Sequence, residues 1–595
     1  TVVVRATYPG ANPKVIAQTV ATPLEQSING VEGMLYMASQ ATSDGAMQLT
    51  VTFELGTNLD NAQVQVQNRV SQALSRLPTD VQRLGVTTAK SSPDLTMVVH
   101  ITSPKGTEKV GRYDGLYLSN YANLNLRDPL KRIDGVGDAF VFGQGEFAMR
   151  IWLDPNKVAA RNLTASDVVA AIREQNVQVA AGILGAQPNK NAEFQLNVNT
   201  QGRLVTEAEF EQIIIKSGSD GQLVRLKDVA RVEMGASTYS LLSLLDNEDA
   251  AAIAIFQRPD ANSIAISDAV RAQMEELKKS FPQGMSYKIV YDPTVFVRDS
   301  IKAVIITLLE AIALVVLVVI LFLQTWRASI IPLVAVPVSV VGTFAVMYAF
   351  GFTLNVLTLF GLVLAIGIVV DDAIVVVENV ERNIALGHSP LDATKQAMRE
   401  VTGPIIATAL VLCAVFIPTA FISGLTGQFY KQFALTIAIS TVISAFNSLT
   451  LSPALCAVLL KAHGAPKDGL QRGLDRLLGW IFHPFNRFFA HASNAYVRTV
   501  QRILRVSLIA LAVYVGLLAL TGAVFKYTPS GFVPGQDKGY LIGFAQLPDA
   551  ASLERSTEVM RRMSDIAMAQ PGVAHAVAFP GLSIHGFARS PNSGI

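Results

Sequence analysis

Long apolar runs alternate with polar blocks along this chain. Six runs reach about 20 residues, the length that an α-helix needs to cross the hydrocarbon core of a bilayer. The predicted spans are 301–323, 330–350, 354–377, 405–423, 432–459 and 506–525. Because an even number of crossings returns the chain to its starting side, we expect the polar blocks 1–300 and 526–595 on the same side of the membrane.

The polar blocks repeat a short pattern of helix, Gly-containing turn and strand. Its copies are LEQSINGVEGMLYM (24–37), LKRIDGVGDAFVF (130–142) and IAMAQPGVAHAVAF (566–579). A strand, helix and strand unit also recurs, at 51–81 and 254–290. Joined, the two units give β-α-β-β-α-β, the split βαβ or ferredoxin-like arrangement. The pattern predicts a polytopic α-helical membrane protein with a large α+β domain outside the membrane.

The repeats also predict the domain organisation. The predicted parts are a first subdomain at 1–94, a second at 95–147 and 238–296, an insert at 148–237, five spans within 297–460, an amphipathic helical segment at 461–505, a sixth span at 506–525, and a third, truncated subdomain at 526–595. Transporters are commonly built from two such repeats. We therefore expect a second six-helix half after Ile595 and one helix before Thr1.

Charge gives the orientation. The net charge of the whole chain is only +2, which offers no electrostatic case for binding nucleic acid. Segment 461–505 is locally basic, and Arg327 lies in another short connection on the same side. The positive-inside rule makes these parts cytoplasmic and places the large polar blocks in the periplasm of a bacterial cell. A second cytoplasmic helix is predicted to begin after Ser389 and to end at Arg399, as a connector.

Several chemistries are not indicated by the sequence. No G-x-x-x-x-G-K-[ST] motif occurs, so a nucleotide-driven motor within this chain is not expected. Cys413 and Cys456 lie in apolar runs, the seven histidines are scattered, and the methionines do not cluster. We expect no metal site, no cofactor and no enzymatic catalysis.

The unusual chemistry is a carboxylate pair, Asp371 and Asp372, inside the apolar run 354–377. A carboxylate at mid-membrane depth costs about 2.5–3.5 kcal/mol on insertion scales, so such a pair is expected to face protein or water and to have a function. Two like charges at close range in a low dielectric disfavour full ionisation of both. The pair therefore predicts a proton-binding site. Apart from Lys302 at one edge, no Lys or Arg lies deep in the six spans, so we expect the counter-cation to come from outside this chain.

Two alternatives remain open for the intramembrane carboxylates. Asp371 and Asp372 could act only as hydrogen-bonding groups between helices, although one polar residue would suffice for that. Glu310, within the first span, is a candidate accessory carboxylate. Its carboxyl group could equally form a hydrogen bond with the backbone of a neighbouring helix.

Motifs along the chain resemble the resistance-nodulation-division (RND) superfamily, in its hydrophobe/amphiphile multidrug efflux branch. The stretches that carry the resemblance are VVDDAIVVVENVERN (369–383), FLQTWRASIIPLVAVPVSVVGTF (322–344), SLTLSPALCAVLL (448–460) and PSGFVPGQDKGYL (529–541). The resemblance implies a homotrimeric drug/proton antiporter of the bacterial inner membrane. It would work with a periplasmic adaptor protein and an outer-membrane channel, and would take amphiphilic drugs from the periplasm and membrane lipids.

The resemblance also implies roles for single residues. Asp371 and Asp372 match proton-relay aspartates, whose Lys, Thr and Arg partners would lie in the part after Ile595. The three subdomains would form the drug-binding porter, and 148–237 would dock the channel, with 182–203 as an arm towards a neighbouring protomer. The implied drug-pocket residues are Leu95, Val98, Phe142, Tyr291, Phe579, Leu582, Ile584 and Phe587. The last three replace a more Phe-rich pattern of the family.

Two other functions compete with drug export. An RND transporter for lipids would use the same fold, and so would a non-transporting membrane protein that senses lipid. In the second case Asp371 and Asp372 would be structural.

Overall fold

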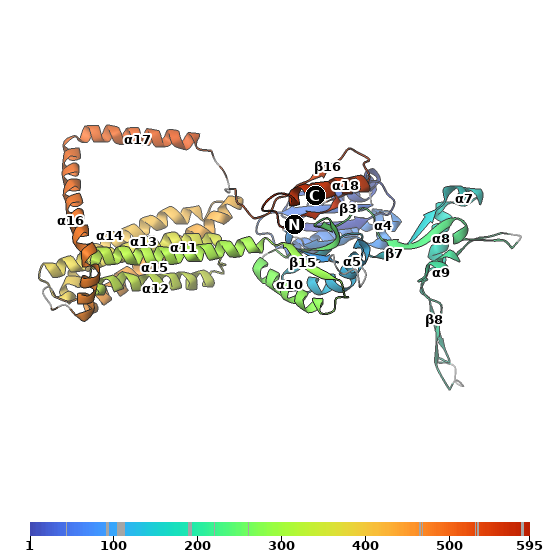
Figure 1. Cartoon of the computed structure of the whole chain (residues 1–595), viewed down its shortest axis with the longest axis horizontal. Helices are drawn as coiled ribbons and strands as arrows, with labels where there is room; N and C mark the ends of the chain where they lie inside the picture. The colour runs from blue at the N-terminus through green and yellow to red at the C-terminus, as the bar shows by residue number, and fades with distance from the viewer. Residues whose placement is uncertain are drawn as a thin grey trace. The chain divides into compact units, whose positions relative to one another are not determined.

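The computed structural model describes the chain except residues 43–44, 91–94, 104–112, 189–192, 219–220, 260, 463–465, 467, 530, 532–534 and 585–587. The chain divides into two compact units, which are described separately below (Figure 1). One unit comprises Thr1–Thr294 together with Tyr540–Ile595, and the other comprises Val295–Gly539.

The first subdomain is a four-stranded antiparallel sheet covered by helices. Its strands are β1 (Val2–Thr7), β2 (Met34–Ala41), β3 (Ala46–Phe53) and β4 (Thr87–Lys90), in the order β2-β3-β1-β4. Its helical segments are α1 (Pro13–Ile16), η1 (Ala17–Ala21), α2 (Thr22–Ile28), α3 (Leu59–Ala73), η2 (Leu74–Arg76) and α4 (Thr79–Leu84). This order is that of the split βαβ fold, as the sequence predicted.

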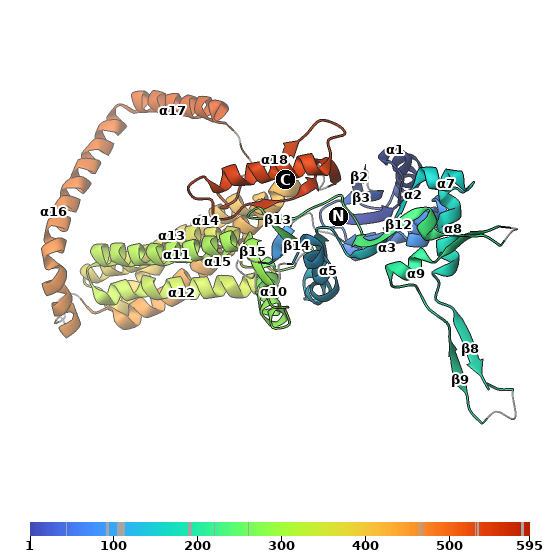
Figure 2. The same cartoon turned by 45° about the vertical axis from the view of Figure 1, so that its right-hand side comes forward.

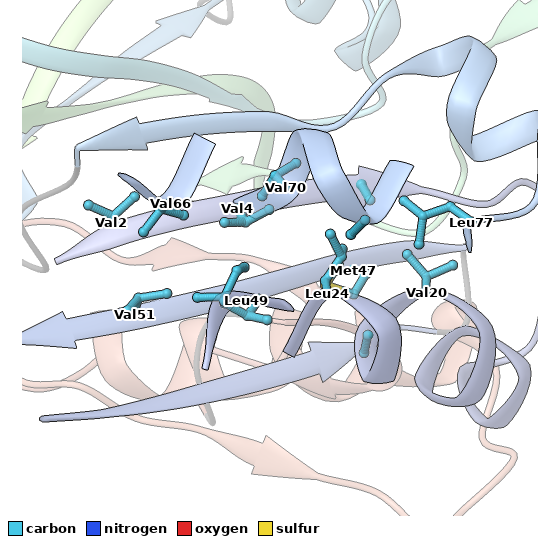
Figure 3. Close-up of a cluster of buried hydrophobic side chains, with 14 of the residues drawn as sticks. Val2, Val4, Val20, Leu24, Met47, Leu49, Val51, Val66, Val70 and Leu77 are labelled. Carbon is cyan, nitrogen blue, oxygen red and sulfur yellow. The ribbon is translucent and has the colours of Figure 1, made fainter. Parts of the chain in front are cut away.

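Alternation along the strands builds the core of this subdomain. Val2 and Val4 of β1 point to the same face as Leu49 of β3, because successive side chains of a strand alternate between faces. They pack against Val66 of α3 and Leu24 of α2, and all five side chains are fully buried (Figure 3).

The second subdomain repeats this topology. Its strands are β5 (Leu95–Thr102), β6 (Val136–Phe142), β14 (Glu248–Gln257) and β15 (Ser286–Tyr291); its helical segments are α5 (Gly115–Tyr121), η3 (Ala122–Leu126), α6 (Arg127–Lys131) and α10 (Ser263–Lys278). The order β15-β5-β14-β6 corresponds strand for strand to the first subdomain. One face of the sheet buries Met97, Val99 and Ile101 of β5 in the helix-covered core.

The repeated turn has a common backbone feature. Gly30, Gly135 and Gly572 lie in the three copies with φ of 84°, 89° and 94°. This left-handed region is readily available only to glycine. At Gly135 a Cβ would also approach Ile266 to 2.9 Å. The glycines thus allow each helix to turn sharply into the following strand.

The insert has its own small core. Its strands are β7 (Phe147–Leu153), β8 (Ala180–Leu184), β9 (Leu196–Asn199), β10 (Ile214–Ser217), β11 (Leu223–Arg225) and β12 (Ala230–Ala236); its helical segments are α7 (Pro155–Ala160), α8 (Ala165–Gln175), α9 (Glu207–Glu211) and η4 (Leu226–Asp228). β7 pairs with β12 from Phe147↔Ala236 to Leu153↔Ala230. The exposed β8–β9 hairpin extends away from α7, α8 and α9 (Figure 2).

The third subdomain joins the second through a strand pair. It contains β16 (Ala545–Gln546), α18 (Leu553–Met568), β17 (Val577–Ala578), β18 (Pro580–Leu582) and β19 (Arg589–Gly594). β17 pairs with β13 (Leu244–Leu245), which continues into β14 of the second subdomain. Leu244, Met560 and Ala578 form a small shared core.

The other unit is helical. It contains α11 (Thr294–Leu323), α12 (Trp326–Ala349), α13 (Val356–Ala385), α14 (Pro390–Thr419), α15 (Gly424–Leu459), α16 (Gly469–Arg505) and α17 (Ser507–Tyr527). All of them except α16 are long and apolar enough to cross a membrane, so each of the six predicted spans lies in its own helix. Helices α11 to α15 run side by side (Figure 1).

One predicted boundary in this unit is wrong. The connector helix predicted to end at Arg399 continues without a break through α14 to Thr419. Its start is as predicted, because the Ser389 side chain caps the helix by accepting from the Asp392 backbone amide at 3.2 Å. Pro404 removes only one backbone donor, and the helix tolerates this loss.

The amphipathic helix α16 is anchored near its start. Asp468 caps the helix and pairs with Arg327 at 2.9 Å, while Trp326 donates to the same carboxylate at 3.3 Å. The hydrogen bond from Arg327 lowers the pKa of Asp468 to about 2. Phe322 of α11 meets the rings of Phe485 and Phe489 at 5.2 and 5.6 Å. This half of α16 is thereby fixed to the α11–α12 turn.

Candidate functional site

The two aspartates of α13 face different surroundings. Asp371 is exposed and lines an open hollow of about 250 Å³ between α11 and α13. The other residues that line the α11–α13 hollow are Leu314, Val315, Val318, Val319, Gly367, Val370 and Ile374. All of these neighbours are apolar or glycine, so Asp371 supplies the only charge of the hollow's described lining.

Asp372 faces α15 and is half-buried. The hydroxyl of Ser444 lies 3.4 Å from its Oδ2 and 3.1 Å from the Val369 carbonyl oxygen. A serine hydroxyl carries one proton, so it can donate to only one of these acceptors at a time. The angle of about 100° between successive helix positions explains why neighbouring carboxylates reach different helices.

Polar side chains on α15 continue past Ser444. Hydroxyl residues recur there at every fourth position, which places them on one side of a helix. They are Thr436, Ser440, Ser444, Ser448 and Ser452, all buried. This row was not among the predicted site residues, although its spacing of four is visible in the sequence of span 432–459. Nearby, Asn447 donates to Ser339 Oγ of α12 at 2.9 Å.

Among the residues that the structure describes, no cation lies against the carboxylates. Within the described part of the chain, neither Asp371 nor Asp372 forms an ion pair. Glu310 is exposed on α11, one turn before Leu314, and it has no hydrogen bond or ion pair to the described residues. Its proposed accessory role therefore stays a prediction.

A second candidate site lies on the sheet of the second subdomain, on the face opposite its helix-covered core. Two cross-strand rows form this face, which we call the aromatic face. One row is Phe142, Ala252, His100 and Lys288, and the other is Phe140, Ala254, Val98 and Tyr291. The outer strands β6 and β15 carry large side chains on this face, whereas β14 carries only the methyl groups of Ala252 and Ala254.

Residues of the third subdomain meet the aromatic face. Phe579 lies against Phe142 with ring centroids 5.3 Å apart, and Tyr540 meets Tyr291 at 5.2 Å. The guanidinium of Arg589 lies 5.9 Å from the centre of the Phe140 ring. Aromatic pairs at such distances contribute about 0.5–1.5 kcal/mol each beyond the burial of their area.

Most predicted pocket residues have a place in this arrangement. The structure brings together Val98, Phe142, Tyr291 and Phe579, as described above. Leu582 is buried in β18, Ile584 is half-buried after it, and Leu95 lies beyond a register shift at the start of β5. Phe587 lies outside the described residues. Phe140, Tyr540, Arg589 and His100 were not among the predicted residues, although the alternation of side chains along a strand could have identified Phe140 from Phe142.

A polar cavity of about 640 Å³ adjoins Phe140 and Arg589. It is lined by residues of the first and second subdomains, including Thr7, Arg127, Lys131 and Asp138. Burial alone would raise the pKa of Asp138, but Lys131 at 2.9 Å and Arg5 at 3.0 Å together lower it. The cavity therefore has fixed charges of both signs beside an aromatic wall.

Comparison with known proteins relates the whole chain to transporters. Residues 1–595 match the AcrB/AcrD/AcrF family. The chain is 43% identical over 568 residues to multidrug resistance protein MdtF of Escherichia coli (strain K12), covering 95% of this chain and 53% of that protein. It is 41% identical over 597 residues to the toluene efflux pump membrane transporter TtgE of Pseudomonas putida (strain DOT-T1E), covering 100% of this chain and 56% of that protein.

A third relative is multidrug export protein AcrF of Escherichia coli (strain K12), 42% identical over 566 residues, with 94% of this chain and 53% of that protein covered. The chain thus spans about half the length of the curated relatives it matches. The match over all residues, with the predicted spans and the repeated split βαβ subdomains, shows that the chain belongs to the AcrB/AcrD/AcrF family of the resistance-nodulation-division superfamily.

Proposed function

We propose that this chain is part of a drug/proton antiporter that exports amphiphilic compounds with energy from the proton-motive force. The observation that carries the proposal is the Asp371–Asp372 pair inside the apolar helix α13. A carboxylate is retained at that depth only where it serves a site, and protons are the ions that carboxylates without a metal exchange most readily.

The two carboxylates would have different roles in proton transfer. Asp371 faces the α11–α13 hollow and Asp372 faces Ser444, so a proton taken up from one side meets a second acceptor on the next residue. The required cation would come from a part of the protein outside this chain. Movement of α13 relative to its neighbours would then follow from the change in charge.

The aromatic face would form part of the drug path. Its aromatic side chains, with Arg589 and the polar cavity beside Phe140, suit molecules that have an apolar body and a polar end. The names of the relatives, which include a multidrug export protein and a toluene efflux pump, agree with such substrates.

The same proposal covers location and assembly. The protein would lie in the bacterial inner membrane, with the subdomains in the periplasm. It would form a homotrimer and join a periplasmic adaptor and an outer-membrane channel through the insert that contains β7 to β12.

The test uses the full-length protein in cells that lack other efflux pumps. We expect Asp371→Asn and Asp372→Asn each to abolish export of a fluorescent amphiphile while leaving the protein in the membrane at normal amount. Glu378→Gln also converts a carboxylate into an amide, two turns further along the same side of α13 but outside the α11–α13 hollow, and should retain export. Unchanged export in both aspartate variants would refute antiport and favour a structural pair.

The competing function of lipid transport makes a different prediction. If the protein transports lipid, the parent protein should not export the drug. The aspartate substitutions should then alter the lipid composition of the cells instead. Export by the parent, lost in both variants, would exclude it.

A further inference from the structure

A histidine lies buried in the middle of the aromatic face. His100 has 0% exposed surface, and neither ring nitrogen has a hydrogen-bond partner among the described residues. Buried polar groups are normally paired, because leaving one without a partner costs free energy. The described residues thus leave both ring nitrogens of His100 available to a further partner.

The position of His100 connects it to the predicted drug path. Val98 lies two residues earlier on β5 and therefore on the same face of the sheet. Ala252 separates His100 from Phe142 in the same cross-strand row. Only the methyl group of Ala252, which is also fully buried, separates the imidazole from the Phe142 ring along this row.

The charged groups nearby are already paired with one another. Lys288, the other cross-strand neighbour of His100, lies 3.9 Å from Asp246. Asp246 also accepts from the Ala576 backbone amide at 3.0 Å and lies 2.9 Å from His575 Nδ1. The carboxylate therefore has partners other than His100.

His100 is neutral at physiological pH. Burial lowers its pKa to about 4, and the opposing effect of Asp246 is smaller. A neutral imidazole has one N–H donor and one nitrogen acceptor. Its two ring nitrogens can therefore form hydrogen bonds with a hydroxyl or an amide group, and the neutral ring has no charge that would compensate a buried ion.

We propose that His100 is a specificity-determining residue of the export path, which binds an uncharged hydrogen-bonding group of a substrate held against the aromatic face. The inference rests on the function proposed above. Substrate would reach the imidazole when the segments that cover the face separate from the sheet. The apolar body would then lie along Phe142 and Val98, and the imidazole would select a hydroxyl or amide over a hydrocarbon of the same shape.

The experiment compares two competitors of the same shape. In cells that make the full-length protein, export of N-phenyl-1-naphthylamine is followed by fluorescence while 4-phenylbenzamide or 4-isopropylbiphenyl is added. The parent should be inhibited by the amide at a lower concentration than by the hydrocarbon. In His100→Leu this preference should fall by about fivefold, the effect of one neutral hydrogen bond. His100→Gln, which retains a donor and an acceptor, should keep part of it.

Thr102→Val serves as the matched control. Thr102 lies on the same face of β5 and is also buried. Its replacement by Val removes a polar group without altering the shape of the side chain. It should leave the preference unchanged. The inference is overturned if His100→Leu keeps the parent's preference, or if Thr102→Val reduces it equally.

The result is separate from the test of antiport. Loss of all export in Asp371→Asn with an unchanged preference in His100→Leu would refute only the role of His100. Export that survives both aspartate substitutions would refute the proposed function, whatever His100→Leu does to competition.

Discussion

The two candidate sites are built in opposite ways. In α13, residues adjacent in the chain are separated in space, because Asp371 faces the α11–α13 hollow and Asp372 faces Ser444. On the aromatic face, residues distant in the chain are brought together by strand pairing, as Phe142 and Phe579 show. One site depends on which atoms two neighbouring side chains carry, and the other depends on the register of a whole sheet.

This difference determines how each site can fail. A change of one functional group is enough to disable the carboxylates, even where the helix is undisturbed. On the sheet, a slip of one residue in β5 would exchange His100 and Val98 for the core residues Val99 and Met97. Chemistry is therefore the sensitive property in the membrane, and shape is the sensitive property on the sheet.

The largest expected effect separates the neighbouring aspartates by length alone. Asp372→Glu should reduce export by at least tenfold, because the extra methylene pushes the carboxylate into packed α15. Asp371→Glu should retain most activity, since its side chain extends into the open hollow. The measurement is the export rate per molecule of membrane protein. Equal losses in the two variants would show that the two environments do not differ functionally.

The second prediction concerns His100 and acid stability. The unfolded state binds a proton at pKa 6.5, while the folded state resists protonation down to about 4. Folded-state stability should therefore fall as pH drops from about 6.5 towards 4, by up to about 3 kcal/mol. His100→Leu should lack this loss. Thermal unfolding of the purified full-length protein at pH 7.5 and 5 measures it, and a parallel decline in parent and variant would contradict it.

The third prediction tests shape on the aromatic face. Ala252→Phe should overpack the space between Phe142 and His100, which costs about 1–3 kcal/mol of stability. Export of bulky substrates should fall more than export of small ones. Ala252→Gly, which adds neither volume nor a polar group, is the control and should leave the ratio of bulky to small substrate export unchanged. A uniform loss for all substrates would indicate general misfolding instead.

Local anomalies were predictable from the residues themselves, whereas the aromatic face was predicted only in part, and only through the family resemblance that named Val98, Phe142, Tyr291 and Phe579. A charge in an apolar helix is unusual in its own neighbourhood, so Asp371 and Asp372 could be identified directly, and glycine turns gave the repeated subdomains. His100 and Tyr540 are unremarkable in their local sequence, and only strand register places them at one site. The break predicted after Arg399 failed because a single proline does not end a helix that neighbouring helices support.

The smallest expected effect concerns the hydroxyl beside Asp372. Ser444 donates at 3.1 Å to a backbone carbonyl and lies only at the outer limit of hydrogen bonding, 3.4 Å, from the carboxylate. Ser444→Ala should therefore reduce export by no more than about threefold, the worth of a weak neutral hydrogen bond. Ser440→Ala, on the same row, should change export less, because Ser440 Oγ has no hydrogen-bond partner among the described residues. The export rates of the two serine variants are compared over a range of external pH. A loss in Ser444→Ala as complete as in Asp372→Asn would mean that the hydroxyl itself transfers the proton, and both α13 and α15 would then carry the relay.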